Sequence, residues 1–192
     1  MAAAVFLSAL LLAGALSGCA SQSEKTGSSA QSAAEGKKEG SASFRTVEEI
    51  RNSGVIRIGV FTDKAPFGYI DSKGENQGYD VFYARRIAED LGVKAEFTSL
   101  DPASRVEYVS TGKIDITLAN FTVTKERAEQ VDFALPYMKV ALGVVSPEDK
   151  EIKSVDELKG KTLIIAKGTT AETYFEKNHP EVKLQKYDAY AD

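Results

Sequence analysis

Residues 114–127 read Ile-Asp-Ile-Thr-Leu-Ala-Asn-Phe-Thr-Val-Thr-Lys-Glu-Arg, and this stretch is the strongest indication of the fold class. Its first part, residues 114–119, is apolar and partly β-branched, which predicts a strand. Thr124 then precedes a short charged segment, which is typical of a helix start. A strand followed by a helix through a polar turn is the repeating unit of α/β proteins. We therefore expect this turn at the carboxyl edge of a parallel sheet, where α/β proteins bind ligands.

The alternation of strands and helices continues on both sides of this stretch. Before it, we predict a helix that starts with a capping box at Thr46 and ends at Gly54, followed by a strand over 55–60 and a loop over 66–78. A helix capped by Asp80 then runs to Leu91, and a strand over 93–97 and a helix over 103–110 follow it. After Pro136, we predict strands over 141–145, 163–166 and 182–187, a capping box at Ser154 and a helix over 170–178. Two such runs predict two small α/β lobes with parallel sheets, residues 44–138 and 139–192.

Three predicted strands end in residues that could bind a ligand. Strand 55–60 is followed by Lys64 and by two aromatic residues, Phe61 and Phe67, on a loop that contains a proline. Strand 114–119 is followed by Asn120, Thr122 and Arg127. Strand 163–166 is followed by Gly168-Thr169-Thr170, where backbone N–H groups at a helix start favour an anion.

Each of these features also has an ordinary structural explanation. Gly-Thr-Thr is a common turn and helix cap, an arginine is often a solvated helix residue, and the two phenylalanines could belong to the core. Their joint position at successive strand ends favours a binding site. In such a site the planar guanidinium of Arg127 would form a two-pronged ion pair with a carboxylate.

Composition argues against several other classes of function. Apolar residues make up 43% of the 192 residues, and the net charge of -4 is mild and mixed along the chain. Without a basic stripe, binding to nucleic acid is disfavoured. The single histidine, His179, precedes a proline and has no second histidine to share a metal, so we expect a surface residue. We predict no cofactor, no metal and no catalytic residue.

The first 43 residues predict export and attachment to a membrane. Residues 5–16 form an apolar run that is too short to span a bilayer and fits a secretory signal peptide, residues 1–19. Leu16-Ser17-Gly18-Cys19 resembles a bacterial lipobox, in which Cys19 carries the lipid, palmitate included; the alternative is an incidental cysteine. Residues 20–43 contain no large apolar residue, which predicts a disordered tether.

Several stretches together resemble the solute-binding proteins of polar amino-acid ABC transporters, the family 3 type. The stretches are Ala65-Pro66-Phe67, Gln77-Gly78-Tyr79-Asp80-Val81, residues 113–116 and 119–127, Val131-Asp132-Phe133, Pro136-Tyr137 and residues 167–171. The resemblance extends from Phe44 to Asp192. It implies the type II periplasmic-binding-protein fold, in which two α/β lobes enclose a ligand cleft.

The resemblance also implies roles for individual residues. Arg127 would pair with the ligand's α-carboxylate and Thr122 would bind it through its hydroxyl and amide. Asn120 would offer its carbonyl to the α-ammonium, and Thr170 an amide from the second lobe. The remaining candidates, near the ligand side chain, are Lys64, Phe67 and Arg105.

The ligand class stays open at this stage. Two cations near the side chain favour aspartate or glutamate, whereas Ala-Asn-Phe-Thr and Lys-Gly-Thr-Thr-Ala are shared with cysteine and cystine binders. For Lys64 and Arg105, solvated charge near a cleft is the alternative. The resemblance implies no cofactor, an ABC permease and ATPase as partners, and an extracytoplasmic, lipid-anchored location.

Members of this family continue past the position of Asp192. The resemblance therefore implies an incomplete second lobe and weak ligand binding by these 192 residues alone. The alternatives from other functional classes are a small-carboxylate dehydratase on the same fold and a ligand-sensing module.

Overall fold

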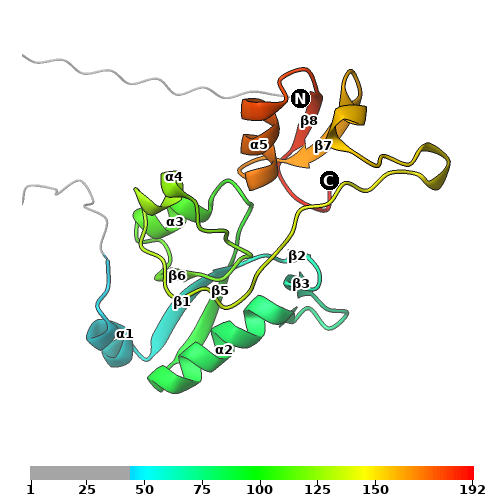
Figure 1. Ribbon diagram of the computed structural model, residues 1–192. Helices are drawn as coiled ribbons and strands as arrows, with labels where there is room; N and C mark the ends of the chain where they lie inside the picture. Colours follow the sequence, from blue (N-terminus) through cyan, green and yellow to red (C-terminus); the bar gives the residue numbers. More distant parts are fainter. Residues whose placement is uncertain (1–43) are drawn as a thin grey trace, which may run out of the picture. The chain divides into compact units, whose positions relative to one another are not determined.

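The computed structural model describes residues 44–192, so the predicted signal peptide, Cys19 and the tether lie outside the described residues. The elements, labelled in Figure 1, are α1 (Val47–Ser53), β1 (Val55–Val60), β2 (Asp63–Lys64), β3 (Gly68–Ile70), β4 (Asn76–Gln77), α2 (Tyr79–Leu91), β5 (Lys94–Ser99), α3 (Arg105–Ser110), β6 (Ile116–Thr117), α4 (Lys125–Ala128), the 3-10 helices η1 (Glu148–Lys150) and η2 (Val155–Leu158), β7 (Thr162–Ala166), α5 (Thr170–Asn178) and β8 (Lys183–Tyr187).

The two sheets that lead to the predicted strand ends are parallel, which confirms the α/β class. In the first, of order β5-β1-β6, Val55 pairs with Lys94 and Ile58 with Ile116. In the second, β7 and β8 pair in parallel, with Leu163 opposite Leu184. Parallel neighbours place their carboxyl ends at one edge of a sheet, so the segments after β1 and β6 leave from the same edge.

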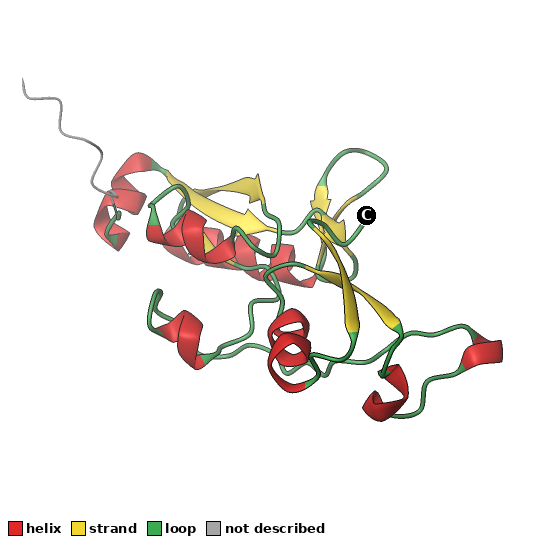
Figure 2. Ribbon diagram, turned by 90° about the horizontal axis from the view of Figure 1, so that it is seen from above, coloured by secondary structure: helices red, strands yellow, loops and turns green. Residues whose placement is uncertain are grey.

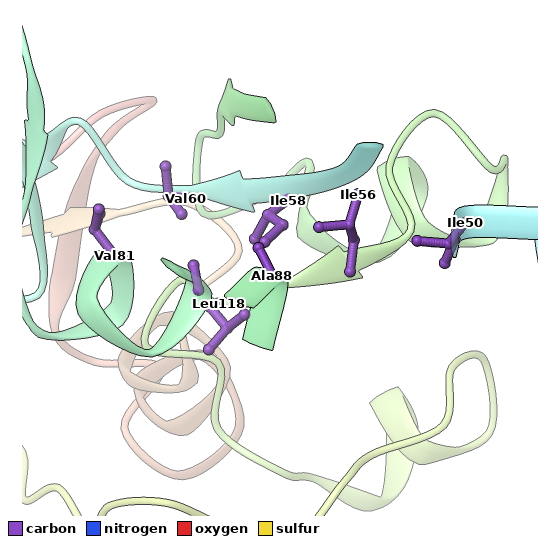
Figure 3. Packing of buried hydrophobic residues seen from close by; sticks show 8 residues of the cluster. Ile50, Ile56, Ile58, Val60, Val81, Ala88 and Leu118 are labelled. Atoms are coloured by element: carbon purple, nitrogen blue, oxygen red, sulfur yellow. The ribbon is translucent and has the colours of Figure 1, made fainter. Parts of the chain in front are cut away.

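Apolar side chains of α1, α2 and the first sheet form its hydrophobic core. Strand β1 alternates at its start, burying Ile56 and Ile58 on the side where α2 packs. Helix α2 lies along β1 and β5 and contributes Val81 and Ala88 at helical spacing (Figures 2 and 3). Smaller clusters lie around Phe61 and Ile114, and around Phe175 between α5 and β7.

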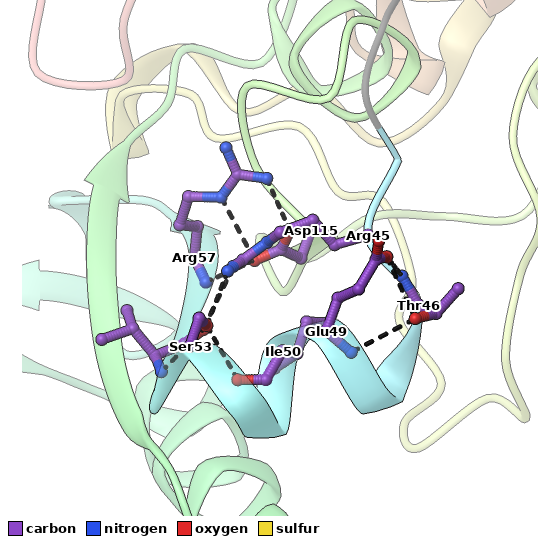
Figure 4. A network of polar contacts seen from close by, with 8 residues as sticks. Arg45, Thr46, Glu49, Ile50, Ser53, Arg57 and Asp115 are labelled. Carbon is purple, nitrogen blue, oxygen red and sulfur yellow. Dashed lines mark hydrogen bonds and ion pairs between the residues drawn. The ribbon is translucent and has the colours of Figure 1, made fainter.

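Helix α1 begins with the predicted capping box, and an ion pair holds the segment before it to the start of β6 (Figure 4). The Thr46 hydroxyl accepts a hydrogen bond from the Glu49 N–H at 3.2 Å, and the Glu49 carboxylate accepts one from the Thr46 N–H at 2.7 Å. Asp115, directly before β6, accepts hydrogen bonds from the guanidinium groups of Arg45 and Arg57. The start of β6 is thus held to β1 and to the segment before α1.

Two predictions for the first lobe were wrong. The expected loop over 66–78 contains two strands of a small antiparallel sheet, β2-β3-β4, in which Tyr69 pairs with both Asp63 and Gln77. Asp80 does not cap α2, because the cap is Gly78 and makes no side-chain hydrogen bond. Asp80 is instead fully buried and accepts bonds from elsewhere in the chain.

Two predictions for the second run also fail. No strand forms over 141–145, where Leu142 and Val145 are 66% and 99% exposed and no described strand pairs with this segment. The Ser154 side chain makes no cap hydrogen bond, and the turn that follows is a 3-10 helix. The Glu157 carboxylate accepts from the Lys153 N–H and not from the Ser154 N–H, so the capping box does not form. The strands and helix that follow lie within a residue of the predicted ranges.

Candidate functional site

A cavity of about 410 Å³ lies where β1, β6 and β7 end. Its lining residues are Lys64, Phe67, Arg105, Asn120, Thr122, Arg127, Lys139, Val140, Ala141, Leu142, Thr169, Thr170 and Tyr190. All seven residues predicted to bind ligand therefore lie in the wall of one cavity. The three strand ends that the sequence singled out do meet there.

Arg127 reaches the cavity from the first turn of α4. The Thr124 side chain caps that helix by accepting the Arg127 N–H at 3.3 Å. The guanidinium donates to the carbonyl oxygens of Thr122 at 2.7 Å and Gly168 at 2.9 Å, and its carbon lies 4.6 Å from the centre of the Phe121 ring. These contacts fix the plane of the guanidinium, and a carboxylate partner for it is absent among the ion pairs of residues 44–192.

Arg105 is buried, with 3% of its surface exposed, so the alternative of a solvated charge is wrong for this residue. Its guanidinium donates to four carbonyl oxygens, those of Pro102, Ala119, Asn120 and Gly168, at 2.9–3.2 Å. Burial, and then the positive charge of Arg127, lower the pKa of Arg105 to about 10, which leaves it charged at neutral pH. Carbonyl oxygens satisfy its N–H groups without neutralising its charge.

Lys64 is half-buried in the same cavity. Its ammonium donates to Asn120 Oδ1 at 3.0 Å and lies 3.9 Å from the centre of the Tyr190 ring and 5.6 Å from that of Phe67. Burial, and then the charge of Arg105, lower the pKa of Lys64 to about 8. The ammonium is therefore held by an amide and by aromatic faces, which attract cations weakly.

Asn120 is the turn between β6 and the α4 segment, in the left-handed backbone region at φ 44°. Its N–H donates to Asp80 Oδ2 at 2.7 Å, and Asp80 Oδ1 accepts the Tyr137 hydroxyl at 2.7 Å. Its carbonyl, which the family resemblance would give to a ligand ammonium, accepts from Arg105 at 3.2 Å. Asp80 thus positions the turn that carries three candidate residues.

The Gly168-Thr169-Thr170 turn differs from its prediction in one respect. The Gly168 N–H donates to Glu172 at 2.7 Å and the Thr169 hydroxyl caps α5, so Gly168 presents its carbonyl oxygen, and not its amide, to the two arginines. Gly168 has φ +70°, and a Cβ there would lie 2.4 Å from Ala103 Cα, so only glycine fits. Thr170 lines the cavity at the first residue of α5.

Sequence reasoning missed Asp80, Lys139 and Tyr190 as parts of this region. Asp80 stands in the Gly-Tyr-Asp-Val stretch, but its position in a helix start pointed to a cap. Tyr190 is far away in sequence, and the Tyr190 N–H donates to Asp63 Oδ2 at 2.7 Å, a contact without a local sequence signal.

Residues 44–192 contain no helix that combines the length and the apolar character needed to span a membrane. Nor do they contain a group of three or more His, Cys, Asp or Glu side chains placed to hold a metal ion.

The parallel sheets and the cavity at their carboxyl edge define a ligand-binding protein of the type II periplasmic class. The family model described as bacterial extracellular solute-binding proteins, family 3, matches residues 56–190. The chain belongs to this family.

Proteins similar to this chain include binding proteins for several amino acids. The chain is 32% identical over 193 residues to the glutamine-binding protein of Geobacillus stearothermophilus. This alignment covers 97% of this chain and 72% of that protein. The chain is similar to the crystal structure of the solute receptors for L-cysteine of Neisseria gonorrhoeae, with TM-score 0.74, 59% identity and coverage of 76% of this chain and 61% of that one. The cysteine-binding protein from Campylobacter jejuni is similar to this chain with a TM-score of 0.73 and 55% identity, and the match covers 75% of this chain and 59% of that one. The chain thus spans less than two thirds of these two structures.

Proposed function

We propose that this protein is the amino-acid-binding component of an ABC importer, and that the cavity at the strand ends is its ligand site. The observation that carries the proposal is the guanidinium of Arg127, which is fixed in plane inside the cavity and has no carboxylate partner among residues 44–192. A ligand α-carboxylate is the anion that such a group binds in two-pronged geometry.

The other lining residues supply complementary groups for an amino acid. Thr122 lies beside Arg127 and offers a hydroxyl and an amide, and Thr170 offers an amide from the start of α5. The carbonyl of Asn120 is an acceptor for an ammonium group, which it would share with Arg105. Phe67, Lys64 and Arg105 then surround the ligand side chain.

We propose L-cysteine as the ligand. Support comes from the two cysteine-binding structures, which share 59% and 55% identity with this chain. Aspartate or glutamate is the second candidate, because four of the described lining side chains are basic and none is acidic. Among residues 44–192 no lining residue is a histidine or a carboxylate, so the cavity gives no specific support to the dehydratase alternative.

We further propose that the protein works outside the cytoplasm, held to the membrane by lipid on Cys19 and lifted from it by residues 20–43. Ligand bridging the two lobes would stabilise a closed form, which the permease then recognises. Labelling with a radioactive fatty acid tests the anchor: the wild-type protein should incorporate label, and Cys19→Ala should not.

The ligand proposal is tested by a thermal-shift screen of the complete gene product with the twenty amino acids and cystine. A ligand at a hundred times its Kd stabilises the native state by about 2.7 kcal/mol, which raises Tm by several degrees. The shift should be largest with L-cysteine and should disappear in Arg127→Ala. Arg86→Ala, an exposed arginine of α2, is the matched control and should keep it. If no amino acid raises Tm, the proposal is wrong.

A further inference from the structure

The cavity carries an excess of positive charge that an amino-acid zwitterion would not balance. Within the part of the chain that the structure describes, its lining contains Lys64, Arg105, Arg127 and Lys139, and no Asp or Glu. A zwitterion brings one carboxylate and one ammonium, so its own net charge is zero. If Arg127 pairs with the carboxylate, the remaining basic groups face the ammonium and the side chain.

Two of these groups are withdrawn from water. Arg105 is 3% exposed and is bonded only to backbone carbonyls. Lys64 is half-buried and its hydrogen-bond partner is the Asn120 side-chain amide. Buried charges are costly unless an opposite charge lies close to them. The cavity is therefore built to receive a negative charge on the ligand side chain.

Nearby acidic groups do not remove this excess. Asp80 does not line the cavity and accepts hydrogen bonds from the Asn120 N–H and the Tyr137 hydroxyl. Asp63 accepts the backbone N–H groups of Tyr190 and Ala191. Even with both carboxylates counted, basic groups exceed acidic ones by two.

The remaining titratable groups around the cavity are already paired, exposed or neutral. Glu172 of α5 forms an ion pair with Lys186 and accepts the Gly168 N–H. Glu126, next to Arg127 on α4, is exposed. The Tyr190 phenol has a pKa raised by burial, so it stays neutral.

We propose that Lys64 and Arg105 hold bound L-cysteine as its thiolate, so that binding at neutral pH expels the thiol proton. This inference rests on the proposed function. In the step, the S–H bond breaks, sulfur keeps the electron pair and the proton passes to the solvent buffer. No oxidant is involved, since the sulfur keeps its oxidation state.

The direction follows from electrostatics. A free thiol has a pKa of about 8.5, so at pH 6.5 only about 1% of it is ionised. An opposite charge close by lowers an acid's pKa by about 1–3 units, and cysteine thiols beside Lys or Arg show this effect. With both Lys64 and Arg105 close to the sulfur we expect about 3 units, which makes bound cysteine about 90% thiolate at pH 6.5. Lys64 itself, with a pKa of about 8, is charged at pH 6.5 and takes up almost no proton on binding.

The test is calorimetric titration of the complete gene product with L-cysteine, under reducing conditions, in buffers of different ionisation heat. At pH 6.5 we expect release of about one proton per cysteine bound. Linkage then requires Kd to fall about five- to tenfold between pH 6.5 and 7.5, because Lys64 takes up part of a proton toward the upper end of that range. Ultraviolet absorption of the thiolate should appear on binding. S-methyl-L-cysteine, which has the same ammonium but no S–H, should release no proton.

Each other result has a defined meaning. Cysteine binding without proton release or thiolate absorption would overturn this inference alone, and proton release with S-methyl-L-cysteine would place the proton on the ammonium and also overturn it. Absence of cysteine binding would overturn both this inference and the proposed ligand.

A pair of variants assigns the effect to the cavity. Lys64→Gln should raise the Kd for L-cysteine at pH 6.5 about fivefold and halve the proton release, because about one unit of pKa lowering is lost, and should raise the Kd for S-methyl-L-cysteine by a smaller factor. Lys94→Gln, at an exposed lysine of β5, should change neither. An unchanged Kd in Lys64→Gln would overturn the role given to Lys64.

Discussion

Asp115→Asn should destabilise the protein strongly, because this carboxylate joins three segments of the fold that lead to the proposed ligand site. Its side chain is 3% exposed and accepts hydrogen bonds from two guanidinium groups and from the Arg57 N–H at 2.7 Å. Asparagine keeps one acceptor oxygen and places an NH2 group against the donors of Arg45 and Arg57. Two partly buried cationic groups then lose their counter-charge.

The magnitude follows from burial. Breaking a buried ion pair costs about 3–5 kcal/mol, and the arginines here are 20% and 30% exposed, so water compensates in part. We expect a loss of about 3 kcal/mol, which corresponds to a fall in Tm of about 6–12 °C for a domain of this size.

Urea denaturation followed by circular dichroism at pH 7 measures this loss. Asp149→Asn, at an exposed carboxylate of η1, is the matched control and should stay within about 0.5 kcal/mol of wild type. A loss below 1 kcal/mol in Asp115→Asn would show that this carboxylate does not hold the three segments together.

The same pair of proteins gives a pH signature. Burial alone would raise the pKa of Asp115, but the hydrogen bonds from Arg45 and Arg57 lower it well below its ordinary value. The stabilisation is therefore complete above the unfolded-state pKa of about 3.9 and decreases as pH falls below it. The wild type should lose its advantage over Asp115→Asn in acid and keep it from pH 5 to 8.

Three further substitutions test local features of the fold, each by urea denaturation. Thr46→Ala removes the capping box with Glu49 and should cost about 1 kcal/mol, whereas Thr46→Ser should cost little. Phe175→Ala empties a buried site between α5 and β7 and should cost about 3–5 kcal/mol. Tyr137→Phe leaves Asp80 without its 2.7 Å hydroxyl donor and should cost about 1–3 kcal/mol; a loss near zero would show that water replaces the hydroxyl.

Local sequence patterns predicted the elements whose stability is local. Helix α5 has the predicted bounds, and α1 has the predicted capping box and its glycine stop. The predicted strand over 141–145 failed because an apolar run alone does not make a strand. A strand also needs a partner, and none of the described strands pairs with that segment.

The site shows the same limit on a larger scale. The family resemblance and the positions of strand ends pointed to Lys64, Arg105 and Arg127, and these side chains do line one cavity. Some of their partners could not be predicted, because these come from distant parts of the chain. Tyr190 stands over Lys64, and Asp80 holds the turn at Asn120.

The carbonyl oxygen of Gly168 links these observations to ligand binding. It accepts from Arg105 at 3.0 Å and from Arg127 at 2.9 Å, so two cations share one neutral acceptor. Hydrogen bonds of a guanidinium to a carboxylate are about twice as strong as those to a neutral oxygen. A ligand carboxylate would therefore compete with Gly168 for Arg127 and leave the carbonyl to Arg105. Because Gly168 belongs to the turn between β7 and α5, that exchange would couple occupancy of the site to the contact between the predicted lobes.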